Sequence, residues 1–293
     1  MSAYHPQVKV MNSYSDNKVL NTIWSKPSLR SKRREGLRKH SYSLVSLASV
    51  AIVITIWELS GVLSWVNPLL LPPPSEVFKT AHELVINGYR QSTLWQHIFI
   101  SSLRAIVAFI AAIAIGIPLG LLMGLSRALT AVLNPFVQFL RPLPKIALIP
   151  LVIVWLGIGE ESKFFLIFIS SLLSIVVGAA AAVANVSISK IRAAQTLGAG
   201  RFQIFIYVVL PNALPELFTT VRLSIGIGWT SLIAAEMVAA ESGLGWMVIN
   251  AGSYLRTDIV VLGIVLLGLM GYLFDCTLVI LQKHFVPWAG KDA

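Results

Sequence analysis

The sequence predicts an all-α, polytopic membrane protein with about six transmembrane helices. Its mean hydropathy is +0.77, and only 12% of its 293 residues are charged, whereas about a quarter of the residues of a soluble domain are charged. The apolar residues gather into six long runs, each close to or above the roughly 20 residues that a helix needs to cross a bilayer. This composition excludes a soluble globular protein.

Residues 1–42 form a basic tail ahead of the first apolar run. They carry nine Lys or Arg against two acidic side chains, which supplies +7 of the net charge of +10. A basic segment in this position is typical of the cytoplasmic side of a membrane protein. We expect the tail to be largely disordered, with an interfacial helix near the arginine cluster. Because the charge lies in a tail beside a membrane span, we expect no nucleic-acid binding.

The transmembrane domain is predicted over residues 43–283, and 284–293 form a short cytoplasmic tail. The first span runs over about 43–64. An external connection, 65–96, follows it, and Ser75 is expected to cap a helix there over 76–86. The other spans run over about 97–124, 130–158, 164–186, 214–238 and 259–282.

The basic residues outside the spans indicate the orientation of the chain. With the N-terminus inside, fifteen Lys and Arg fall in cytoplasmic segments and four in external segments. Cytoplasmic loops are the ones enriched in these residues. The asymmetry therefore predicts that both termini and the stretch 187–213 are cytoplasmic.

Prolines interrupt two of the spans. Gly116 and Pro118 predict a kink in the second, and Arg141-Pro142-Leu143-Pro144-Lys145 predicts a break in the third. A broken helix at membrane depth is tolerated where it lines a cavity, and an arginine beside the break suits an anion. Arg141, Pro142 and Pro144 are therefore candidate pathway residues, with a packing kink and a buried ion pair as the alternative.

Of the other charges inside spans, Arg104, Arg222 and Glu236 are candidate pathway residues. A charge near the bilayer centre costs at least about 2.5–3.5 kcal/mol. Arg104 and Arg222 lie about two turns from the ends of their helices, so they would either line the pathway or extend to the headgroups. Glu236 would pair with a cation, orient a gate or lie solvated at the external end. It is about four turns from Arg222 on the same helix, which excludes that pair.

A polar and basic island, residues 189–215, separates two apolar runs. Its apolar residues recur at helical spacing, and Gly198-Ala199-Gly200 interrupts them. This pattern predicts a short helix, a turn at Gly198 and a second helix stopped by Pro211 and Pro215. Such a hairpin would bind a partner or rest on the bilayer surface.

From Ala193 onward the island resembles the "EAA" loop of the membrane subunits of bacterial ATP-binding-cassette importers. The order is Ala-Ala, three residues, Gly198, nine residues, Val208, one residue and Leu210-Pro211. In that family the loop forms coupling helices that bind a groove of the ATPase subunit. Arg192 stands where many members have Glu. The resemblance implies coupling helices at about 187–211, with these coupling residues: Arg192, Ala193, Ala194, Gly198, Ala199, Arg201, Leu210 and Pro211.

Nearly all of residues 43–290 are similar to the nitrate, sulfonate and taurine branch of these importers. The motifs that carry the similarity lie at 71–74, 141–144, 155–159, 192–199, 234–236 and 243–245. Shorter matches at 93–97, 210–216 and 287–288 are nearest to the taurine permeases.

The resemblance implies a type I importer permease in the bacterial inner membrane. It would act as a homodimer with two ATPase subunits and an external solute-binding protein. It would import a small anionic or zwitterionic solute, taurine or another sulfonate, with nitrate or bicarbonate as the alternative.

The chain contains no GxxxxGK[ST] loop and no clustered metal ligands. We therefore expect no enzyme activity and no cofactor in this chain, with ATP and Mg held by the partner ATPase. An ion-gradient-driven secondary transporter is a further alternative, although the two halves show no repeat.

Overall fold

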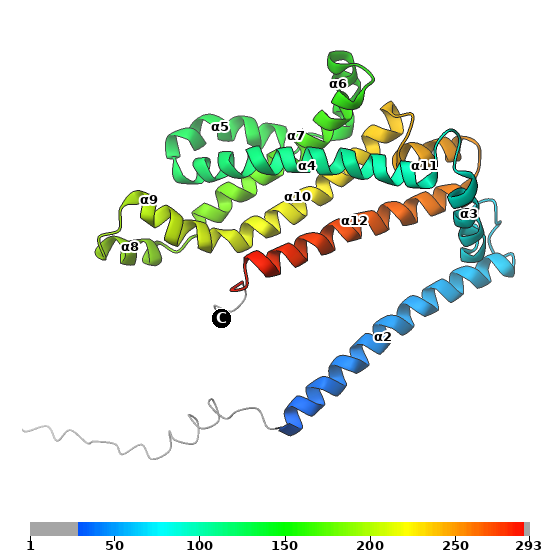
Figure 1. Ribbon diagram of the computed structural model, residues 1–293, viewed down its shortest axis with the longest axis horizontal. Coiled ribbons are helices and arrows are strands. Elements are labelled where there is room, and N and C mark those ends of the chain that lie inside the picture. The colour runs from blue at the N-terminus through cyan, green and yellow to red at the C-terminus, as the bar shows by residue number, and fades with distance from the viewer. Residues whose placement is uncertain (1–28, 290–293) are drawn as a thin grey trace, which may run out of the picture. The chain divides into compact units, whose positions relative to one another are not determined.

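The computed structural model describes residues 29–289, which form helices joined by loops, with one isolated β-bridge between Tyr89 and Ser92 (Figure 1). The all-α prediction is confirmed. By their internal contacts the residues divide into two units, Met1–Leu59 and Ser60–Ala293. Within the described residues, five helices are long and apolar enough to cross a membrane, or six if one bent pair counts as a span.

The described part of the first unit is most of helix α2, Leu29–Val62. Its apolar portion, Val45–Val62, matches the predicted first span. The arginine cluster belongs to the first turns of this helix. The expectation of disorder over 1–40 is wrong for residues 29–40, which belong to α2, and its remaining part, 1–28, lies outside the described residues.

Three long helices form the centre of the second unit: α4 (Leu94–Leu125), α7 (Glu160–Ala184) and α10 (Leu210–Ala239). Helix α7 packs against both of the others. On α4, Gly116, Gly120 and Gly124 recur every fourth residue along the contact. A Cβ added at Gly120 would lie 2.5 Å from the carbonyl oxygen of Val176. Small residues at this spacing let two membrane helices approach closely.

The third predicted span is broken, as its prolines indicate. Helix α5 (Arg127–Leu140) is followed by the short 3-10 helix η1 (Lys145–Leu148) and by α6 (Ile149–Leu156). The axes before and after the break differ by 90°. Lys145 Nζ donates hydrogen bonds to the carbonyls of Leu140, at 3.3 Å, and Arg141, which satisfies backbone oxygens that the break leaves free.

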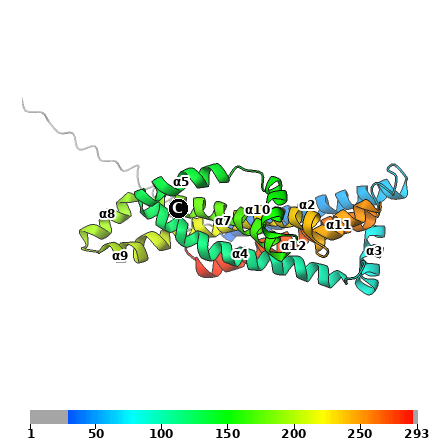
Figure 2. The same cartoon turned by 90° about the horizontal axis from the view of Figure 1, so that it is seen from above.

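The remaining helices lie near the ends of the second unit. Helices α3 (Pro74–Asn87) and α11 (Leu244–Ser253) lie at one end, where α12 (Thr257–Phe285) begins (Figures 1 and 2). Helices α8 (Ile188–Thr196) and α9 (Arg201–Ile204) lie at the other end. The expectation that Ser75 caps α3 is wrong, because the helix begins at Pro74 with Pro73 in the cap position. Pro suits the first helical position because it has no N–H to lose there.

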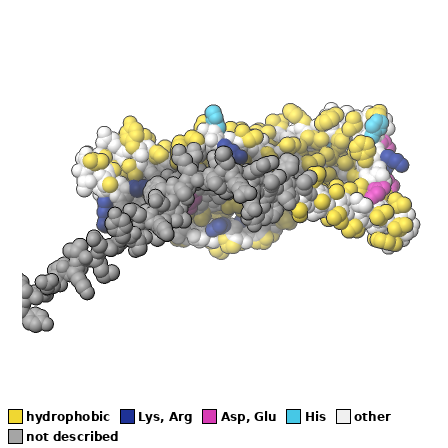
Figure 3. Space-filling view, turned by 90° about the horizontal axis from the view of Figure 1, so that it is seen from below, with side chains coloured by type: hydrophobic (Ala, Val, Ile, Leu, Met, Phe, Trp, Pro, Cys, Tyr) yellow, Lys and Arg dark blue, Asp and Glu magenta, His cyan; other side chains and the backbone are white. Residues whose placement is uncertain are grey.

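Hydrophobic side chains predominate on the described part of the face in Figure 3. Helices α4 and α12 carry large hydrophobic residues that are half or more exposed, such as Ile110 and Ile280. Apolar surface of this extent suits a bilayer or a partner subunit.

Candidate functional site

Residues 188–209 form a projecting hairpin, which we call the hairpin segment. It consists of α8 (Ile188–Thr196), α9 (Arg201–Ile204) and the π-helical turn η2 (Phe205–Val209). Gly198 makes the turn with φ of 81°, in the left-handed region that side chains with a Cβ rarely adopt. A Cβ at this position would meet nothing within 4 Å. The backbone conformation, and not lack of space, therefore requires glycine, as the sequence predicted.

The tip of the hairpin segment is apolar and exposed. Leu197 is 88% exposed and Phe202 is 77% exposed, and they flank the turn in sequence. Arg192 and Arg201 are exposed nearby, as is Ala193, whereas Ala194 and Ala199 are half-buried. An apolar tip with basic neighbours offers a partner both hydrophobic and electrostatic contacts.

The second helix of the hairpin is not stopped by its prolines, so this part of the prediction is wrong. Helix begins again at Arg201 and continues through η2 into α10, with Pro211 in the first turn of α10 and Pro215 inside it. Pro215 has no N–H to donate to the carbonyl of Pro211, four residues earlier. Trp288 Nε1 donates to that carbonyl instead, at 3.3 Å. A side chain from beyond α12 thus replaces the missing backbone donor.

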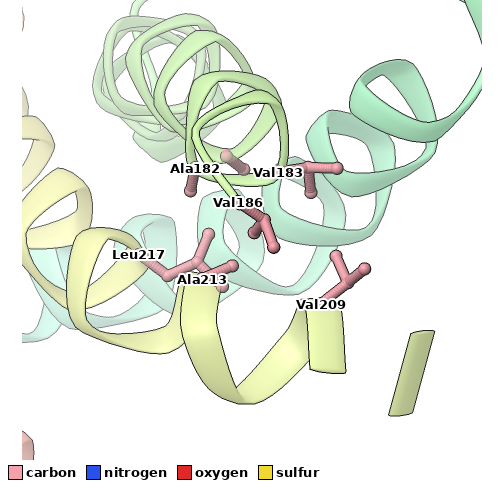
Figure 4. Packing of buried hydrophobic residues seen from close by; sticks show 7 residues of the cluster. Ala182, Val183, Val186, Val209, Ala213 and Leu217 are labelled. Carbon is pink, nitrogen blue, oxygen red and sulfur yellow. The ribbon is translucent and has the colours of Figure 1, made fainter. Parts of the chain in front are cut away.

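The base of the hairpin segment is fixed to α7 and α10. Figure 4 shows the end of α7 and the start of α10 packed together through a cluster of buried aliphatic side chains. Two hydrogen bonds cross the base: Lys190 Nζ to Asn212 Oδ1 at 2.6 Å, and Asn185 Nδ2 to Glu216 Oε1 at 2.8 Å. The cluster consists of Ala179, Ala182, Val183, Val186, Val209, Ala213 and Leu217. A displacement of the hairpin would therefore act on both long helices.

The far ends of the same two helices meet at a cluster of charged side chains. The Arg104 guanidinium on α4 donates to both Glu160 oxygens at 2.6 Å, and its Nη1 donates to Glu236 Oε1 at 2.7 Å. Lys163 Nζ donates to Glu160 Oε1 at 2.9 Å. Glu160 begins α7, and Glu236 lies near the end of α10. The cluster thus joins three helices, and it places two cations against two carboxylates.

Glu236 also holds the start of α11. Its Oε2 accepts a hydrogen bond from the backbone N–H of Gly245 at 2.9 Å. Ser101 donates to both Glu236 oxygens, at 2.8 and 2.9 Å, and its hydroxyl oxygen accepts from the N–H of Leu244 at 2.8 Å. A carboxylate at a helix N-terminus satisfies free N–H groups and is favoured by the helix dipole. Gly243 has φ of 120°, and a Cβ there would lie 2.6 Å from Glu236 Cδ.

The structure brings two of the predicted pathway charges together and separates the others. Arg104 and Glu236 form an ion pair in which their side chains are 8% and 0% exposed. A solvated Glu236 and an Arg104 that extends to the headgroups are therefore both wrong. Arg222 pairs with Asp275 on α12 at 2.8 Å. Arg141, Pro142 and Pro144 are exposed at the bend between α5 and η1.

Sequence reasoning missed the partners of these arginines. Asp275 is the only charge in the predicted last span, and the rule that membrane charges pair could have matched it to Arg222. Glu160 lies in the predicted loop after 155–159, and its contact with Arg104 depends on how α4 and α7 pack. The contact between Glu236 and Gly245 explains why the motifs at 234–236 and 243–245 occur together.

Comparison with known proteins agrees with this architecture. The family described as "Binding-protein-dependent transport system inner membrane component" matches residues 116–290. The taurine transport system permease protein TauC of Escherichia coli is 40% identical over 84% of this chain and 90% of its own length. The putative aliphatic sulfonates transport permease protein SsuC of Escherichia coli is 36% identical over 80% of this chain and 88% of its own. A chain of the inward-facing MetNI methionine ABC transporter superposes with a TM-score of 0.57 at 20% identity, covering 70% of this chain and 98% of that chain.

The family match and the helices long enough to cross a membrane identify the chain as the membrane subunit of a transporter. The chain belongs to the binding-protein-dependent transport system inner membrane components, the permeases of ATP-binding-cassette importers. It is thus a multi-pass inner-membrane protein and a non-enzymatic subunit. Among the branches of that family it is similar to the taurine and sulfonate permeases.

Proposed function

We propose that this chain is the membrane subunit of an ATP-driven importer that moves taurine or another sulfonate into the cytoplasm. Two copies would work with two ATPase subunits and an external solute-binding protein. The observation that carries this proposal is the hairpin segment, an exposed apolar tip on a base fixed to both α7 and α10. The printed substrate classes of the relatives, taurine and aliphatic sulfonates, support the choice of solute.

The hairpin segment would bind the ATPase subunit in the cytoplasm. Leu197 and Phe202 would supply apolar contacts, since both are more than three-quarters exposed. Arg192 and Arg201 would add charge, and the other contacts would come from the coupling residues Ala193, Ala194, Gly198 and Ala199. Leu210 and Pro211 would carry the motion into α10. The excess of basic residues on this side supports a cytoplasmic orientation for it and for both termini.

Helices α7 and α10 would transmit the motion across the membrane. Each has one end at the hairpin base and the other at the charged cluster. A turn or shift of the hairpin, caused by closure of the ATPase dimer on ATP, would displace Glu160 and Glu236 relative to Arg104. Because packed helices move as rigid elements between discrete arrangements, opening of one side can be coupled to closing of the other.

The pathway itself would be lined by the interrupted third span and by Arg222, and the buried pair of Arg104 and Glu236 would reach it only when the external end rearranges. Arg141, exposed beside Pro142 and Pro144, suits a transient contact with a sulfonate, because the guanidinium forms paired hydrogen bonds with planar or tetrahedral oxyanions. Arg104 and Glu236 would act at the external end and Arg222 deeper in the membrane. The binding protein would supply most of the selectivity.

The proposal is tested by purifying the chain with its cognate ATPase and measuring ATP hydrolysis in nanodiscs. Binding protein loaded with taurine, an alkanesulfonate, nitrate or bicarbonate is added in turn. We expect the ATPase to copurify and the taurine-loaded or sulfonate-loaded protein to stimulate hydrolysis. Stimulation by nitrate or bicarbonate alone would reject the sulfonate assignment. Failure of any ATPase to copurify, with solute flux through the chain alone, would reject the importer.

A further inference from the structure

A small, partly open cavity lies between α10 and α12, within two of the predicted spans. Its volume is 190 Å³, and an ion pair, two aromatic rings and two glycines line it. The charged residues are Arg222 and Asp275. The cavity is distinct from the external charged cluster, which contains neither of these residues.

The ion pair at this cavity is placed unusually for a membrane protein. Asp275 lies seven residues before 282, the predicted end of the last span, or about 10 Å along the axis, which is a third of the thickness of a ~30 Å hydrocarbon core. Yet the side chains of Arg222 and Asp275 remain 34% and 45% exposed. Half-exposed charges at such depth face water, a partner or a ligand, because lipid chains solvate them poorly.

The walls of the cavity are suited to a small solute. Trp229 and Phe274 contact each other edge to face, with ring centroids 5.3 Å apart. The missing side chains of Gly226 and Gly271 leave the space open: a Cβ at Gly226 would meet nothing within 4 Å, and one at Gly271 would lie 3.3 Å from Trp229 Nε1. The volume is below the roughly 300–1,000 Å³ typical of sites for drug-sized ligands. A solute with only a few heavy atoms fits this scale.

We propose that this cavity binds zwitterionic aminosulfonates during transport, with Arg222 holding the sulfonate and Asp275 the ammonium. The two atoms of the guanidinium that now face Asp275, Nε and Nη2, each donate at 2.8 Å to one carboxylate oxygen. A sulfonate presents the same spacing of acceptor oxygens to that fork. The released carboxylate accepts hydrogen bonds from the ammonium group of the solute, and the aromatic walls favour a cation beside them.

The cavity presents one cation, Arg222, beside one anion, Asp275, and this pair of charges favours a zwitterionic solute. A simple anion at Arg222 would leave Asp275 beside it without a cation, in a region of low dielectric where like charges repel strongly. A zwitterion brings no net charge and gives each protein charge an opposite neighbour. This inference rests on the proposed function and adds a site within the permease to the selectivity supplied by the binding protein.

The test measures weak binding by saturation-transfer NMR on the complex of permease and ATPase in nanodiscs, without binding protein. The probes are taurine, ethanesulfonate, which lacks the ammonium, and ethylamine, which lacks the sulfonate. We expect taurine to bind at least tenfold more tightly than either. Asp275→Asn is expected to remove the advantage of taurine over ethanesulfonate. Arg256→Gln, in the ion pair of Arg256 with Asp258 at the start of α12, should leave it unchanged.

A second variant keeps the test valid if loss of a charge impairs folding. Gly226→Leu fills the cavity without altering the ion pair and should abolish taurine binding, while the melting temperature is retained. Equal binding of taurine and ethanesulfonate to the natural protein, or taurine binding that persists in Gly226→Leu, would overturn the proposed site. If ATP-driven taurine uptake persists in Gly226→Leu, this site fails and the importer stands. If no sulfonate is taken up by the natural protein, the proposed function itself fails.

Discussion

Arg104 and Glu236 join α4 to α10 through an ion pair of 2.7 Å that is almost completely buried. The same guanidinium also holds Glu160 at the start of α7, and the same carboxylate holds the start of α11. One arginine and one glutamate therefore fix the positions of four helices. In the state described here, this ion pair has a structural role. Any rearrangement of the external end must break or move it.

The two carboxylates at Arg104 are expected to differ in their contribution to stability. Glu160 is 63% exposed, whereas Glu236 is fully buried. Removal of one partner from a buried pair typically costs about 3–5 kcal/mol, against about 0.2–1 kcal/mol for an exposed pair. Glu236→Gln should therefore lower the melting temperature in nanodiscs clearly more than Glu160→Gln. Equal shifts would contradict the central role of Glu236.

Gly243 is expected to tolerate no side chain. Its φ of 120° is unfavourable for L residues, and a Cβ would lie 2.6 and 2.7 Å from Glu236 Cδ and Oε2. Gly243→Ala should lower the melting temperature and reduce transport by displacing α11. Gly268→Ala is the matched control, since a Cβ there meets nothing within 4 Å, and alanine favours a helix by up to about 1 kcal/mol. Similar behaviour of the two variants would reject this explanation of the motif at 243–245.

Much of this architecture follows from the sequence by physical argument. Hydropathy places the spans, because only long apolar helices satisfy their backbone in a bilayer. Gly198 predicts the turn of the hairpin because no other residue enters the left-handed region so readily. The contacts of Arg104 with Glu160 and Glu236 could not be predicted in this way, since they depend on the packing of three helices that are distant in sequence. The continuation of helix through Pro211 and Pro215 could not be predicted either. The donor that replaces the missing N–H of Pro215 is the side chain of Trp288, which lies beyond α12.

Gly198 is expected to be essential for coupling because of its backbone alone. Gly198→Val places a β-branched residue at φ of 81°, which is strongly disfavoured. We expect basal ATP hydrolysis by the complex to lose its stimulation by loaded binding protein, while expression and assembly persist. Asparagine enters the left-handed region far more readily, so Gly198→Asn should retain most of the stimulation. The assignment of the hairpin to coupling does not survive if Gly198→Val is stimulated normally.

Trp288 is expected to stabilise the start of α10 by replacing a backbone donor. Trp288→Phe removes the hydrogen bond to the Pro211 carbonyl, for a cost of about 0.5–1.5 kcal/mol. Pro215→Ala restores an N–H four residues after that carbonyl, so the same Trp288→Phe change should cost less in its presence. A double-mutant cycle of melting temperatures measures this difference. Strictly additive effects would show that Trp288 does not compensate for the proline.

The most direct test of the account is uptake of labelled taurine by proteoliposomes that contain the permease and its ATPase. ATP is enclosed on the ATPase side, and the loaded binding protein is added outside. We expect taurine to accumulate only with hydrolysable ATP and binding protein, and to do so even when ionophores collapse all ion gradients. Uptake without ATP that follows an imposed ion gradient would contradict it and would identify the chain as a secondary transporter.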